Sequence, residues 1–151
     1  MSQSSVSGAI HAVINGINRI MPQWIKFSTL PAHIQTVQEQ FWINTNFPGV
    51  IGAIDGTHVA IWPPEKNREH LYINRKLFYS LNVMIVSDYN GIILTVLASH
   101  GGRTHDSRVW NSSRLARYML NKYQNGRRNV WLLGMHTNYK TLLLIHQTKM
   151  K

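Results

Sequence analysis

Hydrophobic residues in the first part of the chain recur at helical spacing. A first set is three or four residues apart, as on one face of a helix: Ile10, Val13, Ile14, Ile17 and Ile20. Pro22 predicts the end of this helix, because proline lacks a backbone N–H. A second helix is predicted over residues 31–44, with Pro31 in its first turn. We expect both helices to pack against a core, as a helical lead-in over residues 1–46.

From residue 47 onward the pattern changes to that of strands. Residues 50–62 form a nearly continuous apolar run, which is typical of a buried central strand. Residues 79–88 and 92–99 are two further strand candidates, and the Asp-Tyr-Asn-Gly sequence at 88–91 predicts a tight hairpin between them. These two strands should therefore pair antiparallel.

A helix is predicted from about residue 106 to 121, and a short strand over 129–133. The resulting order, β-β-β-α-β, resembles the first part of a ribonuclease H-like core. The predicted fold class is α/β, an incomplete core of this kind preceded by two packing helices.

Charge narrows the class of partner. The chain of 151 residues has 16 Lys and Arg against 6 Asp and Glu, a formal net charge of +10. Such a balance favours polyanions, with nucleic acid ahead of an anionic membrane surface. The sequence shows neither an apolar run long enough to span a membrane nor a secretion signal, and it lacks the Cys needed for disulfides or thiolate zinc sites. A nuclear or cytoplasmic location is expected.

Two short motifs carry acidic residues on this basic background. Asp55 interrupts the apolar run within Ile-Asp-Gly-Thr-His at 54–58, and Asp106 lies within Thr-His-Asp-Ser-Arg at 104–108. A carboxylate in a buried strand needs a partner, and Mg²⁺ or Mn²⁺ is one such partner. Alternatively, Asp55 hydrogen-bonds its own backbone in a turn, and Asp106 caps a helix.

The histidines and basic residues leave similar alternatives open. His58 and His105 are candidates for binding metal or phosphate, or for structural hydrogen bonding. Arg75, Lys76, Arg103 and Arg108 are each surface charges when taken singly. Together with other basic and aromatic residues they would form a face that contacts phosphates.

Four ordered motifs give the chain a specific resemblance. The sequence of residues 47–59, the Tyr-Ile-Asn-Arg-Lys of 72–76, the Ser-Leu-Asn-Val of 80–83 and the Thr-His-Asp-Ser-Arg-Val of 104–109 resemble the Harbinger (PIF) transposase family and its domesticated nuclease relatives. The resemblance covers roughly residues 24–133. It implies that residues 47–134 are a partial nuclease domain of the DDE type, with a ribonuclease H-like fold.

The resemblance also implies a chemistry. In this family a divalent metal cation, Mg²⁺ or Mn²⁺, and acidic residues cut DNA at transposon ends. Asp55 would be the first catalytic carboxylate and Asp106 an additional acid of the metal site. The implied partners are DNA and a Myb-like protein, not a membrane, and the implied location is the nucleus.

Four departures stand out from the family pattern. Met135 occupies the position where relatives have an Asp, and the later helix that supplies a Glu is not found in the sequence. Leu77 replaces a frequent Gly, and Arg103 a frequent Ser. If the Gly134 codon ends in G and His136 is encoded by CAT, reading one base earlier gives Asp-Ala-Tyr. This observation suggests that 135–151 is an aberrant, frameshifted tail, with no selected structure over 142–151.

Three functional interpretations follow. The chain is a metal-dependent DNA endonuclease that is impaired by its missing acids, a catalytically dead domain that binds nucleic acid or a protein partner, or a non-functional transposon fragment. Loss of two carboxylates favours the last two, because the metals supply most of the catalysis in such phosphoryl transfers.

Overall fold

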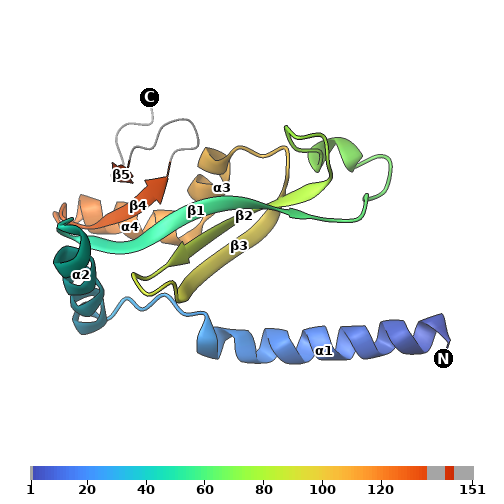
Figure 1. Ribbon diagram of the computed structural model, residues 1–151, viewed down its shortest axis with the longest axis horizontal. Helices are drawn as coiled ribbons and strands as arrows, with labels where there is room; N and C mark the ends of the chain where they lie inside the picture. Colours follow the sequence, from blue (N-terminus) through green and yellow to red (C-terminus); the bar gives the residue numbers. More distant parts are fainter. Residues whose placement is uncertain (1, 136–141, 145–151) are drawn as a thin grey trace.

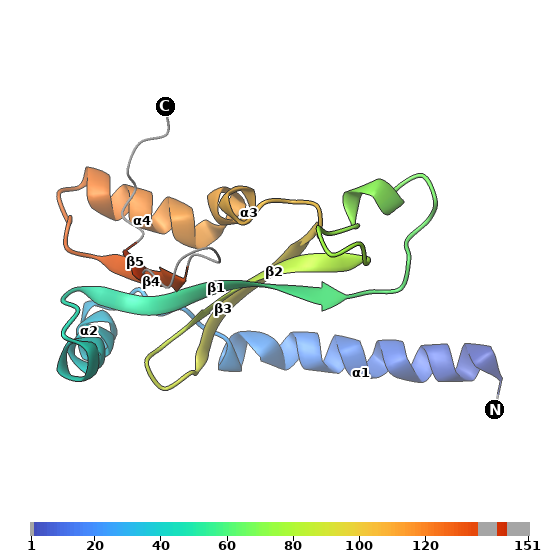
Figure 2. The same ribbon diagram turned by 45° about the horizontal axis from the view of Figure 1, so that its top comes forward.

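A mixed sheet with helices on both faces forms the body of the molecule. The computed structural model describes residues 2–135 and 142–144. Within this part the sheet has five strands in the order β3-β2-β1-β4-β5. Helices α3 and α4 cover one face and α2 lies on the other, while α1 projects from the body (Figures 1 and 2). The predicted α/β class and the β-β-β-α-β order are confirmed.

Helix α1 spans Gln3–Trp24 and begins at Ser2, whose side chain accepts a hydrogen bond from the Ser5 N–H at 3.3 Å. The prediction that Pro22 ends this helix is wrong, since Pro22 lies inside its last turn. The expected packing is also absent, because α1 buries none of its side chains. Tertiary contacts therefore do not explain its apolar stripe.

Helix α2 spans Pro31–Thr45, as predicted, with Pro31 at its start. It ends at Asn46, which adopts a left-handed conformation that stops the helix. Its buried residues, Val37 and Phe41, pack with Val50 at the start of the first strand. This contact fixes α2 on one face of the sheet.

The three consecutive strands follow the predicted pattern closely. Strand β1 (Val50–Ala60) pairs antiparallel with β2 (Ser80–Ser87), and β2 pairs antiparallel with β3 (Ile93–Gly101). Between β1 and β2 lies a short 3₁₀ helix, Glu69–Leu71. The predicted hairpin between β2 and β3 is confirmed: Gly91 has a φ of 80° and the Asp88 carboxylate accepts from the Ile92 N–H at 2.8 Å.

The predicted single helix over residues 106–121 is two helices. Helix α3 is Asp106–Ser112 and α4 is Arg114–Gln124. Ser113 separates them because its backbone is extended (φ −75°, ψ 149°) and its side chain accepts from the Ala116 N–H, which starts α4. Together they cover a core of β-strand residues that includes Ile54 and Val86.

Two further strands complete the sheet. Strand β4 (Trp131–Met135) pairs parallel with β1, and β5 (Leu142–Leu144) pairs antiparallel with β4. Strand β5 was not expected, since residues 142–151 were predicted to have no selected structure. The rest of the predicted tail lies outside the described residues.

Candidate functional site

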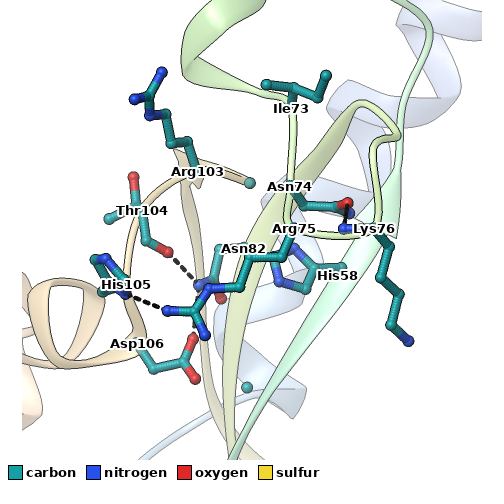
Figure 3. A pocket seen from close by; sticks show the side chains of 12 residues that line it. His58, Ile73, Asn74, Arg75, Lys76, Asn82, Arg103, Thr104, His105 and Asp106 are labelled. Atoms are coloured by element: carbon teal, nitrogen blue, oxygen red, sulfur yellow. Dashed lines mark hydrogen bonds between the residues drawn. The ribbon is translucent and has the colours of Figure 1, made fainter.

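A pocket opens where β1, β2 and two loops meet beside the start of α3 (Figure 3). Its volume is about 520 Å³. Its walls come from β1 (Gly56 and His58), the loop of residues 73–76, Asn82 of β2, and residues 102–106. Segments far apart in the sequence therefore bring basic, acidic and imidazole groups to one place.

Asn82 anchors the acidic residue of this pocket. Its side chain is only 2% exposed. The Nδ2 group donates to the Thr104 carbonyl at 2.8 Å and to Asp106 Oδ1 at 2.7 Å, which uses both of its hydrogens. Asp106 is the first residue of α3, but the structure gives it this partner instead of a capping bond. One oxygen of Asp106 is thus held toward β2 and the other remains available.

The loop that carries Arg75 and Lys76 is organised by a second buried amide. Asn74 is 4% exposed, and its Oδ1 accepts from the backbone N–H groups of Lys76 at 2.9 Å and Phe78 at 3.3 Å. Its Nδ2 donates to Ser80 Oγ at 2.9 Å. Because backbone N–H groups only donate, these bonds also fix which end of the amide is oxygen. Asn74 therefore ties the basic loop to β2.

One tyrosine at the end of this loop is tuned by its surroundings. Burial raises the pKa of Tyr79, and the charge and hydrogen bond of Glu69 raise this pKa further. The shift favours the neutral phenol, which is also the form of an ordinary tyrosine at neutral pH.

Both pocket histidines make hydrogen bonds, and the bond of His105 also fixes its tautomer. Arg75 Nη2 lies 3.1 Å from His105 Nδ1, and because a guanidinium can only donate, Nδ1 accepts and the His105 proton is on Nε2. His58 Nδ1 lies 3.1 Å from Ser80 Oγ. Asn74 also donates to that hydroxyl oxygen, which can still either donate to His58 Nδ1 or accept from it, so both tautomers of His58 fit this bond.

Close backbone approach shapes the pocket wall. A Cβ added at Gly102 would collide with the Ser80 hydroxyl and would lie 2.7 Å from the Tyr72 carbonyl oxygen. A Cβ at Gly56 would lie 3.2 Å from Asp106 Cγ. Glycine at these two positions lets the turn before Arg103 and the start of α3 reach the sheet.

The two predicted metal-site acids lie on opposite faces of the sheet. Position 56 faces Asp106, and successive strand residues point to opposite faces, so Asp55 points away from Asp106. Ala53, which shares a face with Asp55, packs in the cluster under α2. The pocket lining accordingly includes Asp106 but not Asp55.

Asp55 is also not the buried carboxylate that the apolar run suggested. It is exposed, at the point where β1 leaves the core, and its Oδ1 accepts from the Gly56 N–H at 2.9 Å. This local bond is the one that the simpler interpretation of Asp55 expected, although it occurs in a strand and not in a turn. Desolvation therefore does not require a cation beside Asp55.

The position beside Asp55 on the neighbouring strand is occupied by Met135. Ile54 pairs with Gly134 in the parallel register of β1 and β4, so one residue further along Asp55 and Met135 are neighbours. Because no three His, Cys, Asp or Glu residues within the described part of the chain are grouped closely enough for a metal, the residues do not fit a multi-carboxylate site.

The structure thus brings together part of the predicted site. Arg75, Lys76 and Arg103 line the same pocket as Asp106, whereas Arg108 does not line it. The arrangement also depends on Asn74 and Asn82, which sequence reasoning had not singled out as functional, although both lie within the motifs that carried the resemblance.

Comparison with known proteins gives one family and a set of relatives. The family described as "DDE superfamily endonuclease" matches residues 54–134. The Rattus norvegicus protein named "Putative nuclease HARBI1" is 36% identical over 155 residues, which covers 98% of this chain and 43% of that protein. The Homo sapiens protein of the same name is 35% identical over 136 residues, covering 89% of this chain and 37% of that protein.

A more distant relative carries the same name. The Xenopus laevis protein is 31% identical over 135 residues, covering 89% of this chain and 38% of its own length. The chain therefore spans less than half the length of these relatives. No solved structure matches it. None of the helices in the described ranges is long and apolar enough to cross a membrane.

Proposed function

The chain belongs to the DDE superfamily endonuclease family, as its motifs predicted, and on this premise we propose that it is a transposase-derived nuclease domain that binds DNA but cuts it poorly. The substrate class is DNA, which implies a location in the nucleus. The ancestral cofactor is a divalent cation, Mg²⁺ or Mn²⁺. Both the binding of the cation and the weak cutting depend on which residues lie next to Asp55.

One observation carries the proposal of weak cutting. Asp55 points away from Asp106, and the strand position beside it holds Met135 instead of a carboxylate. A hard cation is held in such enzymes by one or two carboxylates, with the substrate phosphates as further ligands. A single exposed Asp gives weak affinity and imprecise placement, so little stabilisation of a transition state is expected.

The basic pocket supports DNA binding. Three cationic side chains, Arg75, Lys76 and Arg103, line the same pocket as the Asp106 carboxylate, on a chain with a formal net charge of +10. Contacts of this kind with phosphates release counterions and do not depend on base sequence. Binding therefore survives the loss of metal-site acids that lie on the other side of the sheet.

Cutting and binding are tested together on supercoiled plasmid DNA with Mg²⁺ or Mn²⁺. We expect a salt-sensitive gel shift, and strand cutting so slow that the unaltered chain and Asp55→Ala cannot be distinguished by rate. Glu65→Ala, an exposed acid in the loop after β1, is the matched control. Cutting that is lost in Asp55→Ala and retained in Glu65→Ala would establish an active nuclease and contradict the proposal.

Restoring the missing acid gives the complementary test. Met135→Asp places a second carboxylate next to Asp55 in the strand register. We expect it to raise the affinity for Mn²⁺, measured by electron paramagnetic resonance of the free ion, and we expect Asp55→Ala in the same chain to abolish the gain. An equal gain without Asp55 would show that the two positions do not share a cation.

A further inference from the structure

The pocket beside α3 combines features that a simple basic surface does not have. Arg75 reaches across it to His105, whereas Lys76 and Arg103 extend from its rim (Figure 3). His105 carries its proton on Nε2 and so presents a donor on the side away from Arg75. The pocket therefore gathers hydrogen-bond donors and positive charge, which suits a phosphate group.

Its one carboxylate argues against phosphate alone as the ligand. Asp106 Oδ1 is engaged by Asn82, which leaves the second oxygen as an acceptor inside a wall of donors. A carboxylate repels an inorganic anion. It accepts a hydrogen bond from a hydroxyl or a base N–H, groups that a nucleotide has in addition to its phosphate.

Size narrows the ligand further. A volume of about 520 Å³ lies in the range of sites that hold one small molecule. A base-paired duplex is too wide to enter it, whereas one unpaired nucleotide is of suitable size. The pocket lies on the opposite face of the sheet from Asp55, so it is separate from the side of β1 where a metal would be expected.

We propose that this pocket holds one unpaired nucleotide of a DNA strand, with its phosphate against Arg75, Lys76 and Arg103 and a hydroxyl or base N–H on Asp106. The identity of the nucleic acid as DNA rests on the proposed function. The division of labour between cations and carboxylate comes from the pocket itself. Because of this division, Asp106→Asn should weaken binding of one ligand and strengthen binding of another.

The test compares a 5′-phosphorylated thymidine dinucleotide, its unphosphorylated form and inorganic phosphate, with binding measured by NMR titration of the full chain. The 5′-phosphate should strengthen binding, and Arg75→Gln should weaken binding of the phosphorylated dinucleotide by about tenfold. Arg108→Gln removes the same charge from α3 outside the pocket lining, and should change affinity less than about twofold because an exposed charge is screened.

The substitution Asp106→Asn distinguishes the binding of a nucleotide from the binding of inorganic phosphate. It should weaken binding of the dinucleotide and strengthen binding of inorganic phosphate. The inference is overturned if the 5′-phosphate has no effect, if Arg108→Gln weakens binding as much as Arg75→Gln, or if Asp106→Asn weakens both ligands. Far-ultraviolet circular dichroism melts of each variant verify that the fold is kept.

These results are distinguishable from failure of the proposed function. Dinucleotide binding without a shift of plasmid DNA would leave the pocket assigned and contradict DNA binding by the domain. A plasmid shift without dinucleotide binding would support DNA binding by the domain and contradict the assignment of the pocket.

Discussion

At the scale of single residues, Leu77 has a backbone that does not suit it. It adopts a φ of 62° and is 81% exposed, in the loop that carries Arg75 and Lys76. The left-handed region costs a non-glycine residue roughly 1–2 kcal/mol. Glycine, which the family resemblance led us to expect at this position, would adopt this φ without strain.

Leu77→Gly should therefore stabilise the fold. Glycine relieves the backbone strain but gains about 0.5–1 kcal/mol of conformational entropy in the unfolded chain, so a net gain of about 0.5–1 kcal/mol is expected in urea unfolding. Leu77→Ala is the control, since it removes the same exposed side chain and keeps the strain. Equal gains in the two variants would show that the side chain, and not the backbone, is responsible.

The sequence singled out some of the residues that line the pocket, but not Asn74 and Asn82, and it indicated only part of their grouping. Motif spacing identified Asp55, Asp106 and the basic residues that line the pocket. It could not show that Asp55 and Asp106 face opposite ways, because that follows from the alternation of β1 and from the packing of α3 at Gly56. Sidedness depends on tertiary contacts that no local pattern records.

At the scale of elements, strands and helices with clear periodicity were predicted well, and their interruptions were not. The hairpin between β2 and β3 has a local turn signal, which is why it was predictable. Pro22 was expected to stop α1, but it lies inside the last turn and the helix continues to Trp24, two residues further along. The helix breaks at Ser113 because this serine caps the start of α4. A serine in the middle of a helix has no such role, so its presence in the sequence did not reveal the break.

Ser113→Ala should show how much this cap stabilises the fold. Ser113 is 4% exposed, and its Oγ accepts from the Ala116 N–H at 2.9 Å. Loss of an N-cap of this type costs about 1 kcal/mol, so the urea midpoint should fall with an unchanged slope. Ser107→Ala, at an exposed position of α3, should be close to neutral. A similar loss in both variants would contradict the capping role.

At the scale of the whole molecule, the sheet separates two surfaces with different chemistry. One face carries α3, α4 and the pocket, and the other carries α2 and the side of β1 to which Asp55 belongs (Figure 2). The basic pocket and the acidic position on β1 can therefore change independently. Loss of a metal-site acid next to Asp55 leaves the charges that attract DNA in place.

The salt dependence of DNA binding measures how strongly the charges of the whole molecule attract DNA. The affinity for duplex DNA should fall steeply with salt, since each phosphate neutralised contributes about −0.9 to the slope of log affinity against log salt. Arg103→Gln, at the pocket rim, should reduce the magnitude of this slope by about 1. Arg19→Gln lies on α1, across the sheet from α3, and should leave the slope unchanged although the net charge falls equally (Figure 2). Fluorescence anisotropy at several salt concentrations gives the slopes. Equal reductions would mean that DNA responds to total charge and not to the face that holds the pocket.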